Sequence, residues 1–190
     1  MRFRHACAAL CWLAAFGAHA HRSNESQIAL RLQADRVQGQ WTVGLHDLPA
    51  VAPLGIVATD DAAIARQIQA RPELALRLVD GLRLAAGAAP CAITPTTHEL
   101  AQRTGSAVWI LRFEARCPTT PARLTVDLRT LFERDPKHLV LLKLEAGAWV
   151  RAAVFSADSA RQAFQPDQTV RPPSTGNSTP VMNSASSLPR

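Results

Sequence analysis

A succession of short segments in which apolar and polar residues alternate is the feature that most constrains the fold of this chain. In residues 26–33 every second side chain is apolar, from Ile28 to Leu32, and residues 40–48 repeat the pattern. Alternation with a period of two is typical of half-buried β-strands. The two alternating segments therefore predict a β-hairpin around the turn-rich stretch 35–39. Further strand-like segments follow at 82–86, 91–102, 106–116, 123–129, 138–144 and 148–155.

One stretch, residues 62–78, has helical rather than strand-like spacing of its apolar residues. Asp60 and Asp61 precede it, and their side-chain oxygens can cap the first turn of a helix. Pro72 interrupts it, which predicts either a kink or two short helices. Because helical spacing occurs only once, the pattern favours a mainly β fold, an antiparallel β-sandwich with one helical insert, over an alternating α/β sheet.

The N-terminus has the three parts of a secretory signal peptide. Arg2 and Arg4 give a basic start, residues 6–16 are apolar, and the small residues at 17–20 match the pattern before a cleavage site. The apolar run is shorter than the ~20 residues that span a bilayer. We therefore expect residues 1–20 to be removed and the mature chain, beginning at His21, to be periplasmic or secreted; the alternative is an uncleaved N-terminal anchor.

The mature chain divides into a domain and a tail. Residues 21–165 hold all the predicted strands, and no later stretch of the sequence is long and apolar enough to predict a transmembrane helix. Residues 166–190 are rich in Pro, Ser and Thr and predict a flexible tail. The expected organisation is one extracytoplasmic β-sandwich domain followed by that tail.

Export also determines which cysteines can pair. Cys7 and Cys11 lie in the signal peptide, so Cys91 and Cys117 remain as the only pair in an oxidising compartment. A disulfide between them closes a loop of about 26 residues and stabilises the fold by roughly 3 kcal/mol through the unfolded chain. Two such distant cysteines without a neighbouring Cys/His pair do not predict a zinc site.

Composition argues against a nucleic-acid partner. The formal net charge of the full sequence is +6, which falls to +4 without Arg2 and Arg4, and the remaining basic residues are scattered rather than clustered. Tyr is absent and aromatic residues make up only 5% of the chain, whereas single-stranded nucleic acids are bound on aromatic stacking surfaces.

Several motifs resemble a known family. His-Arg-Ser-Asn-Glu-Ser at 21–26, Leu-His-Asp-Leu at 45–48, Phe-Glu-Ala-Arg-Cys at 113–117 and Phe-Glu-Arg-Asp-Pro-Lys-His at 132–138 occur in this order. Together they resemble the extracytoplasmic N-terminal domain of the HupE/UreJ family. The resemblance covers roughly residues 18 to 165.

Two departures limit what the resemblance implies. Family members usually continue into a membrane domain associated with nickel or cobalt uptake, whereas this sequence ends in a polar tail. Many relatives carry a calcium-loop-like stretch, but residues 51–61 here have only Asp60 and Asp61 and lack the spaced oxygen ligands that such a loop needs. The resemblance therefore implies a non-enzymatic accessory domain linked to transition-metal handling, without its permease. The alternatives are a structural domain that docks on a membrane protein partner, and a remnant that lost its permease part.

The candidate metal ligands are histidines. After cleavage, the α-amino group and imidazole of His21 can chelate a copper or nickel ion, provided a second histidine lies nearby. His46 and His138 are the predicted further ligands, with His98 also available. The alternative is a frayed terminus with ordinary surface histidines.

The remaining candidates favour structural roles. Asp135 and Pro136 form a rigid corner before His138, so this histidine either binds metal or caps the turn. The sequence has no Gly-x-Ser-x-Gly motif and no free reactive cysteine in the mature chain, and we expect no enzymatic activity. Three tryptophans lie in alternating segments and are expected to pack rather than to bind ligands: Trp41, Trp109 and Trp149.

Overall fold

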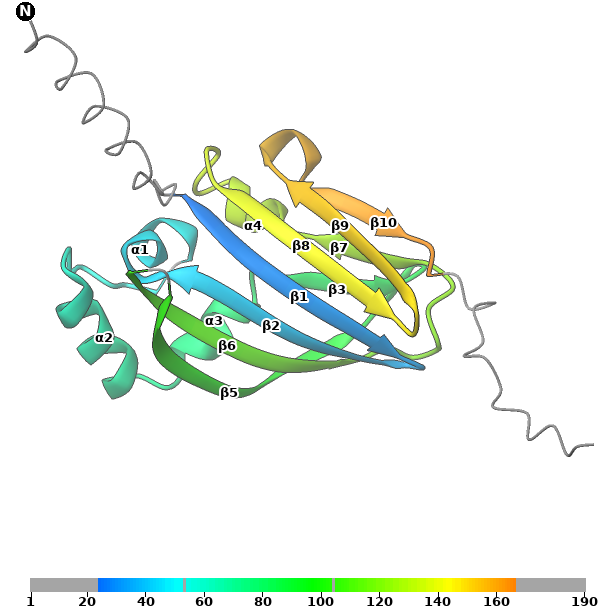
Figure 1. Ribbon diagram of the computed structural model, residues 1–190, viewed down its shortest axis with the longest axis horizontal. Helices are drawn as coiled ribbons and strands as arrows, with labels where there is room; N and C mark the ends of the chain where they lie inside the picture. Colours follow the sequence, from blue (N-terminus) through cyan, green and yellow to red (C-terminus); the bar gives the residue numbers. More distant parts are fainter. Residues whose placement is uncertain (1–23, 53, 104, 167–190) are drawn as a thin grey trace, which may run out of the picture.

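Two β-sheets of unequal size pack against each other in the computed structural model, which describes residues 24–52, 54–103 and 105–166 (Figure 1). The predicted signal peptide, its cleavage point, His21 and the tail from residue 167 onward lie outside the described residues. The predicted mainly β sandwich with a helical insert is confirmed.

The larger sheet has six strands in the order β5-β6-β2-β1-β8-β9. All its neighbours are antiparallel except β1 and β8, which run parallel with Glu25 opposite Leu139. The strands are β1 (Glu25–Gln33), β2 (Arg36–Gly44), β5 (Ala92–Arg103), β6 (Ser106–Arg116), β8 (Leu139–Ala146) and β9 (Trp149–Phe155). The parallel pairing at the centre was not expected from the sequence.

The smaller sheet is antiparallel in the order β10-β7-β3-β4. Its strands are β3 (Arg83–Ala86), β4 (Ala89–Pro90), β7 (Leu124–Asp127) and β10 (Arg161–Phe164). The predicted alternation at 123–129 is wrong, because all four residues of β7 are buried and Arg129 already begins the helix α4 (Arg129–Phe132). Strand β10 was missed because four residues are too short for a recognisable period.

The β1–β2 hairpin is tighter than predicted. Only Ala34 and Asp35 separate the strands, so the prediction of a turn at 35–39 is wrong. Gly39 lies within β2 opposite Phe113, and a Cβ atom at position 39 would lie 2.0 Å from the Phe113 ring. Glycine is therefore present here to let an aromatic ring cross the strand, rather than to turn the chain.

The predicted helical insert forms two short helices, one of the two expected outcomes. α2 (Asp61–Ala70) ends before Pro72, and α3 (Leu74–Val79) begins after it. Asp60 caps α2, since its Oδ1 accepts the backbone N–H of Ala63 at 2.8 Å. Both helices bury apolar side chains in the common core: Ile64, Ile68, Leu74 and Leu78.

The disulfide prediction is confirmed in geometry. Cys91 lies between β4 and β5, Cys117 follows β6, and their sulfur atoms are at bonding distance, 2.01 Å. The bridge therefore links the smaller sheet to the antiparallel β5–β6 pair of the larger sheet. Such a bond is compatible with an oxidising compartment.

Candidate functional site

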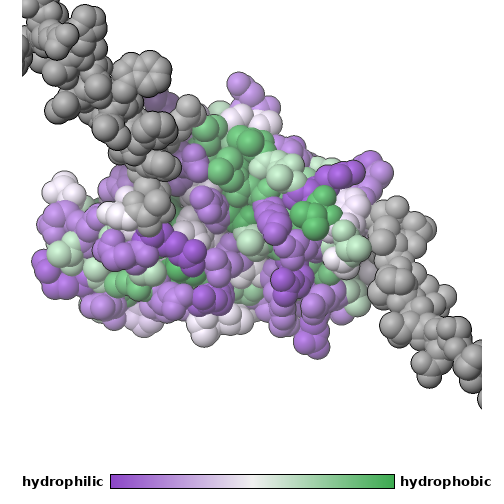
Figure 2. Space-filling model, viewed as in Figure 1, coloured by the Kyte–Doolittle hydropathy of each residue, from purple (hydrophilic) through white to green (hydrophobic). Residues whose placement is uncertain are grey.

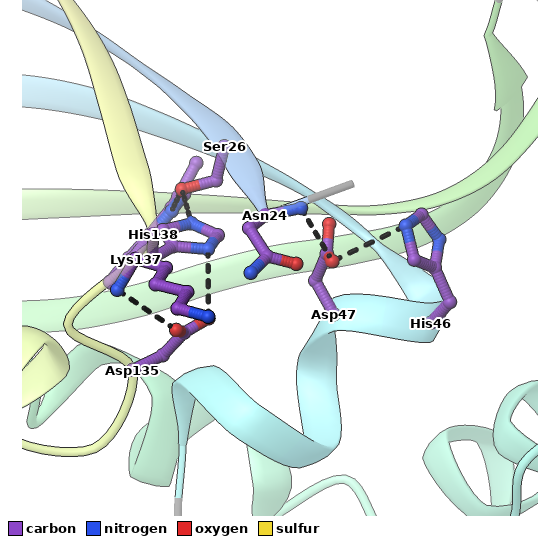
Figure 3. Close-up of polar contacts among 8 residues, drawn as sticks. Asn24, Ser26, His46, Asp47, Asp135, Lys137 and His138 are labelled. Atoms are coloured by element: carbon purple, nitrogen blue, oxygen red, sulfur yellow. Dashed lines mark hydrogen bonds and ion pairs between the residues drawn. The ribbon is translucent and has the colours of Figure 1, made fainter. Parts of the chain in front are cut away.

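A cluster of buried polar side chains lies at the start of β1 (Figure 3). Ser26 is its centre: the Nε1–H of Trp41 donates to Ser26 Oγ at 3.1 Å, and Nε2 of His138 lies 2.9 Å from the same oxygen. All three side chains are essentially inaccessible, with Ser26 and Trp41 at 1% exposure and His138 at 0%. The cluster is thus part of the core.

The strand order of the larger sheet brings these residues together. β1 lies between β2 and β8, so Ser26 is opposite Val43 on one side and Val140 on the other. The turn at Asp135 then fixes the position of His138, because the backbone N–H of His138 donates to the Asp135 carbonyl at 3.1 Å. Asp135 Oδ1 also accepts the backbone N–H of Lys137 at 3.2 Å.

One tautomer of His138 accounts for the hydrogen bonds of Ser26. The Ser26 hydroxyl accepts the hydrogen of Trp41 and has one proton left to donate, which Nε2 of His138 accepts in the neutral ring. Nδ1 then carries the ring hydrogen and lies 3.7 Å from Asp135 Oδ2, and no hydrogen-bond partner reaches it among the described residues. We assign this tautomer from the network.

Burial keeps His138 neutral. Desolvation lowers the pKa of His138 below its ordinary value, and the nearby carboxylates of Asp47, Asp135 and Glu25 oppose that shift only in part. A neutral, enclosed imidazole whose Nε2 accepts a hydrogen bond from a hydroxyl is suited to holding β1, β2 and β8 in register. It does not face solvent, from which a metal ion would arrive.

A second group of polar residues joins this cluster at its outer end. The Oδ1 atom of Asp47 accepts the backbone N–H of Asn24 at 3.0 Å and lies 3.2 Å from Nε2 of His46. Asp47 is buried at 5% exposure, whereas the side chain of His46 is 43% exposed. Asp47 therefore ties the start of β1 to the 3₁₀-helical turn Leu45–Asp47 that follows β2.

Glycine makes room for this arrangement. A Cβ atom on Gly44 would lie 2.9 Å from Asp47 Oδ2 and 3.0 Å from Cε1 of His46. The prediction that a strand continues to residue 48 is wrong for this reason: the chain leaves β2 at Gly44 and turns tightly over it.

The structure separates the predicted metal ligands. His46 is partly exposed, His138 is enclosed in the core, and His98 packs edge-on against Trp109, whose Nε1–H donates to His98 Nδ1 at 3.3 Å. Among the described residues, no group of three or more His, Cys, Asp or Glu side chains is placed to hold a metal ion. His21 lies outside the described residues.

Sequence reasoning missed Ser26 and Asp47. Ser26 has the same strand parity as Ile28 and Leu30, so its inward position was available from the alternation. Asp47 carried no comparable signal, because its burial depends on the turn after β2. Trp41 and Trp109 pack as predicted, each with its indole N–H paired.

The outward face of the larger sheet has a different character. Figure 2 shows hydrophobic residues gathered where β8 and β9 lie in Figure 1. Leu141, Val150 and Val154 are 37%, 47% and 52% exposed, although they are large and apolar. Beside them a shallow depression of about 450 Å³ is lined by, among others, Ala29, Thr42, Leu141, Val150 and Ala152.

Ion pairs border this apolar area. Glu145 accepts both Arg31 at 3.2 Å and Lys143 at 2.6 Å. These contacts lower the pKa of Glu145, chiefly through its hydrogen bonds with Lys143 and Arg31. Further along the sheet, Arg112 pairs with Glu99 at 2.7 Å. Glu114 also lies 3.8 Å from Arg36 and 3.9 Å from Arg116. Together these ion pairs contain five basic residues and three acidic ones.

Comparisons with known proteins assign no family: no protein-family model matches the chain, and no curated protein matches it. Within the described ranges, no helix has the length and apolar character needed to cross a membrane.

Proposed function

We propose that this protein is an exported, non-enzymatic accessory domain that acts by binding another protein, in the periplasm or outside the cell. The observation that carries the proposal is the exposed apolar area on β8 and β9, since large apolar side chains gathered on a protein surface mark interaction sites. The polar residues around Ser26 are buried and contribute to the fold.

The surroundings of this area specify the chemistry of the partner. Arg31 and Lys143 share a single carboxylate, Glu145, so the border carries an excess of positive charge. A complementary partner offers an apolar segment flanked by acidic residues. The extracytoplasmic part of a membrane protein with such a segment is the partner we propose.

Site-specific cross-linking in the cells that export the protein tests this proposal. A photoreactive residue at position 141 should give an adduct of defined size, and Lys143→Glu should reduce it because the charge at the border is reversed. The same photoreactive residue at position 57 is the control, since Val57 is 90% exposed and belongs to a loop away from the strands. Equal adducts from both positions would contradict the proposal.

A second candidate function, binding of a copper or nickel ion, has one observation in its favour. The chain enters β1 at Asn24, which is held by Asp47 next to the partly exposed ring of His46. His21 is three residues before Asn24, and three extended residues span at most about 10 Å. The amino-terminal nitrogen ligands are therefore within chain reach of His46.

Calorimetric titration with copper and nickel separates this function from the first. The mature protein with an authentic His21 terminus should bind the ion more tightly than a form with one added N-terminal residue, and His46→Gln should weaken binding as well. Equal, weak binding by all three forms would remove the metal function and leave the protein-binding proposal untouched.

A further inference from the structure

A hollow of about 310 Å³ lies where the start of β9 meets the end of β10. The two strands belong to different sheets, and β10 returns beside β9 after a short turn (Figure 1). Near that turn the strands are tied together, because Nε2 of Gln162 donates to the Val154 carbonyl at 2.8 Å. At the other end of the strands the hollow is lined by Arg123, Trp149, Arg151, Ala163, Phe164 and Gln165.

Arg151 lies at a position of β9 that faces the core side of the larger sheet. It is directly opposite Leu144 of β8 and has the same strand parity as Phe155, and both of these residues are completely buried. Side chains on the inner faces of a sandwich fill the space between the sheets and are mostly apolar. A guanidinium group at such a position needs water or an anion beside it, because it does not lose its charge.

No carboxylate of the protein neutralises the arginines of this hollow. Its lining contains no Asp or Glu side chain. Within the described ranges, no ion pair includes Arg123 or Arg151. By contrast, Arg31, Arg112 and Arg129 each lie within 3.2 Å of a carboxylate oxygen. The hollow therefore has two positive charges on its walls and no negative one.

Aromatic rings supply the apolar part of the hollow. The guanidinium carbon of Arg151 lies over the Trp149 ring, 5.4 Å from its centroid. Stacking of this kind orients the planar group and leaves its N–H donors free at the edges. Phe164 is fixed against the buried Phe155, with 6.5 Å between the ring centroids. An oriented cation thus lies beside a fixed apolar wall.

We propose that the hollow binds a small organic anion in which a carboxylate is attached to an aromatic or other apolar group. A guanidinium group presents paired N–H donors in one plane, which matches the two oxygens of a carboxylate. Arg123 and Arg151 hold the carboxylate, and the apolar group lies against the rings of Trp149 and Phe164. The site goes beyond the proposed function, because it is on the core side of β9 and the protein-binding area is on the outward face.

An NMR titration of the mature protein with phenylacetate tests the proposal. Trp149 lines the hollow, whereas the indole N–H groups of Trp41 and Trp109 are hydrogen-bonded elsewhere in the fold. Saturable shifts should therefore appear at the Trp149 indole signal and not at the other two. Phenylacetamide, the neutral amide of the same acid, should bind about tenfold more weakly, because it lacks the charge that the arginines recognise.

Substitutions locate the site. Arg123→Gln and Arg151→Gln should each raise the Kd for phenylacetate about tenfold, because each removes a charged hydrogen-bond donor. Arg66→Gln is the matched control and should leave the Kd unchanged, since Arg66 is exposed on α2 and does not line the hollow. Unshifted Trp41 and Trp109 signals in the variants report that the fold is intact.

Three results would overturn the proposal. The first is a Trp149 signal that shows no saturable shift with phenylacetate. The second is equal binding of phenylacetate and phenylacetamide, which would assign the contact to the apolar wall alone. The third is an equal loss of affinity in Arg66→Gln, which would assign it to the overall positive charge of the protein.

Discussion

Ser26 Oγ lies 2.9 Å from Nε2 of His138, although 112 residues separate the two along the chain. The same oxygen accepts the indole N–H of Trp41, so a single hydroxyl satisfies polar atoms from β2 and from the turn before β8. Removing a buried partner costs more than making the bond gains, because the atoms left behind stay desolvated.

Ser26→Ala should therefore destabilise the protein by about 2 to 4 kcal/mol, since it leaves both the Trp41 N–H and the His138 Nε2 without a partner. Denaturant unfolding followed by tryptophan fluorescence measures this loss. Ser106→Ala, at the start of β6, is the matched control and should change the free energy of unfolding by under about 0.5 kcal/mol. Equal effects of the two substitutions would contradict the assigned network.

Acid should weaken the fold through His138. Its pKa is lowered in the folded state by burial, so the unfolded chain binds the proton more readily. The stability that the neutral ring provides is fully present above its unfolded pKa of about 6.5 and is lost as the pH falls below that value. The slope should reach at most ~1.4 kcal/mol per pH unit.

Urea unfolding between pH 7.5 and pH 5 tests this dependence. His138→Gln should flatten the slope while lowering stability throughout, and His46→Gln serves as the control for a partly exposed histidine. An unchanged slope in His138→Gln would show that another group carries the pH dependence.

Gly39→Ala should destabilise the protein by about 1 to 3 kcal/mol, because the added methyl group would overlap the Phe113 ring. The double variant Gly39→Ala/Phe113→Leu should lose less than the sum of the two single variants, since removing the ring frees the space. A double-mutant cycle measured by thermal unfolding checks this coupling. Strictly additive effects would mean that the two residues do not share that space.

Asp60→Ala should cost about 1 kcal/mol, because Asp60 supplies the side-chain cap of α2. Asp61→Ala is a close control, since Asp61 lies in the first turn but does not accept the Ala63 N–H. The difference between their free energies of unfolding measures the cap itself. Equal losses would assign the effect to charge near the helix end instead.

Reduction of the Cys91–Cys117 bond should lower the free energy of unfolding by about 3 kcal/mol, as expected for a closed loop of this length. Thiol counting under denaturing, non-reducing conditions checks the bond directly in the protein isolated without reductant. Two free thiols in that measurement would contradict the disulfide.

Local patterns predicted β1, β6 and the two helices of the insert, and for a physical reason. The alternation of β1 and the caps of α2 depend on near neighbours, and β6 runs over the predicted residues, Ser106–Arg116. The pairing of β1 with β8 was not predictable in this way. The alternation within a strand shows which side chains face the core, but it does not show which distant strand lies beside that strand.

The polar cluster shows the same limit. Ser26 could be placed inward from the period of β1, but the burial of His138 follows from the turn at Asp135 and from the β1–β8 pairing together. A histidine in a polar turn resembles a surface residue until that pairing is known. For this reason the sequence left two roles open for His138, metal binding or capping of the turn. Its enclosed position favours the structural role.

The parallel pairing of β1 with β8 also has a consequence for how the chain reaches its native state. Arg31 and its partner Glu145 are 114 residues apart, so the pairing of β1 with β8 forms only after nearly the whole domain has left the ribosome. Contacts this distant in sequence slow folding, because a long loop must close before they stabilise anything. Until β8 has formed, β1 lacks its partner on the side away from β2, so β8 is the strand that completes the pairing of β1.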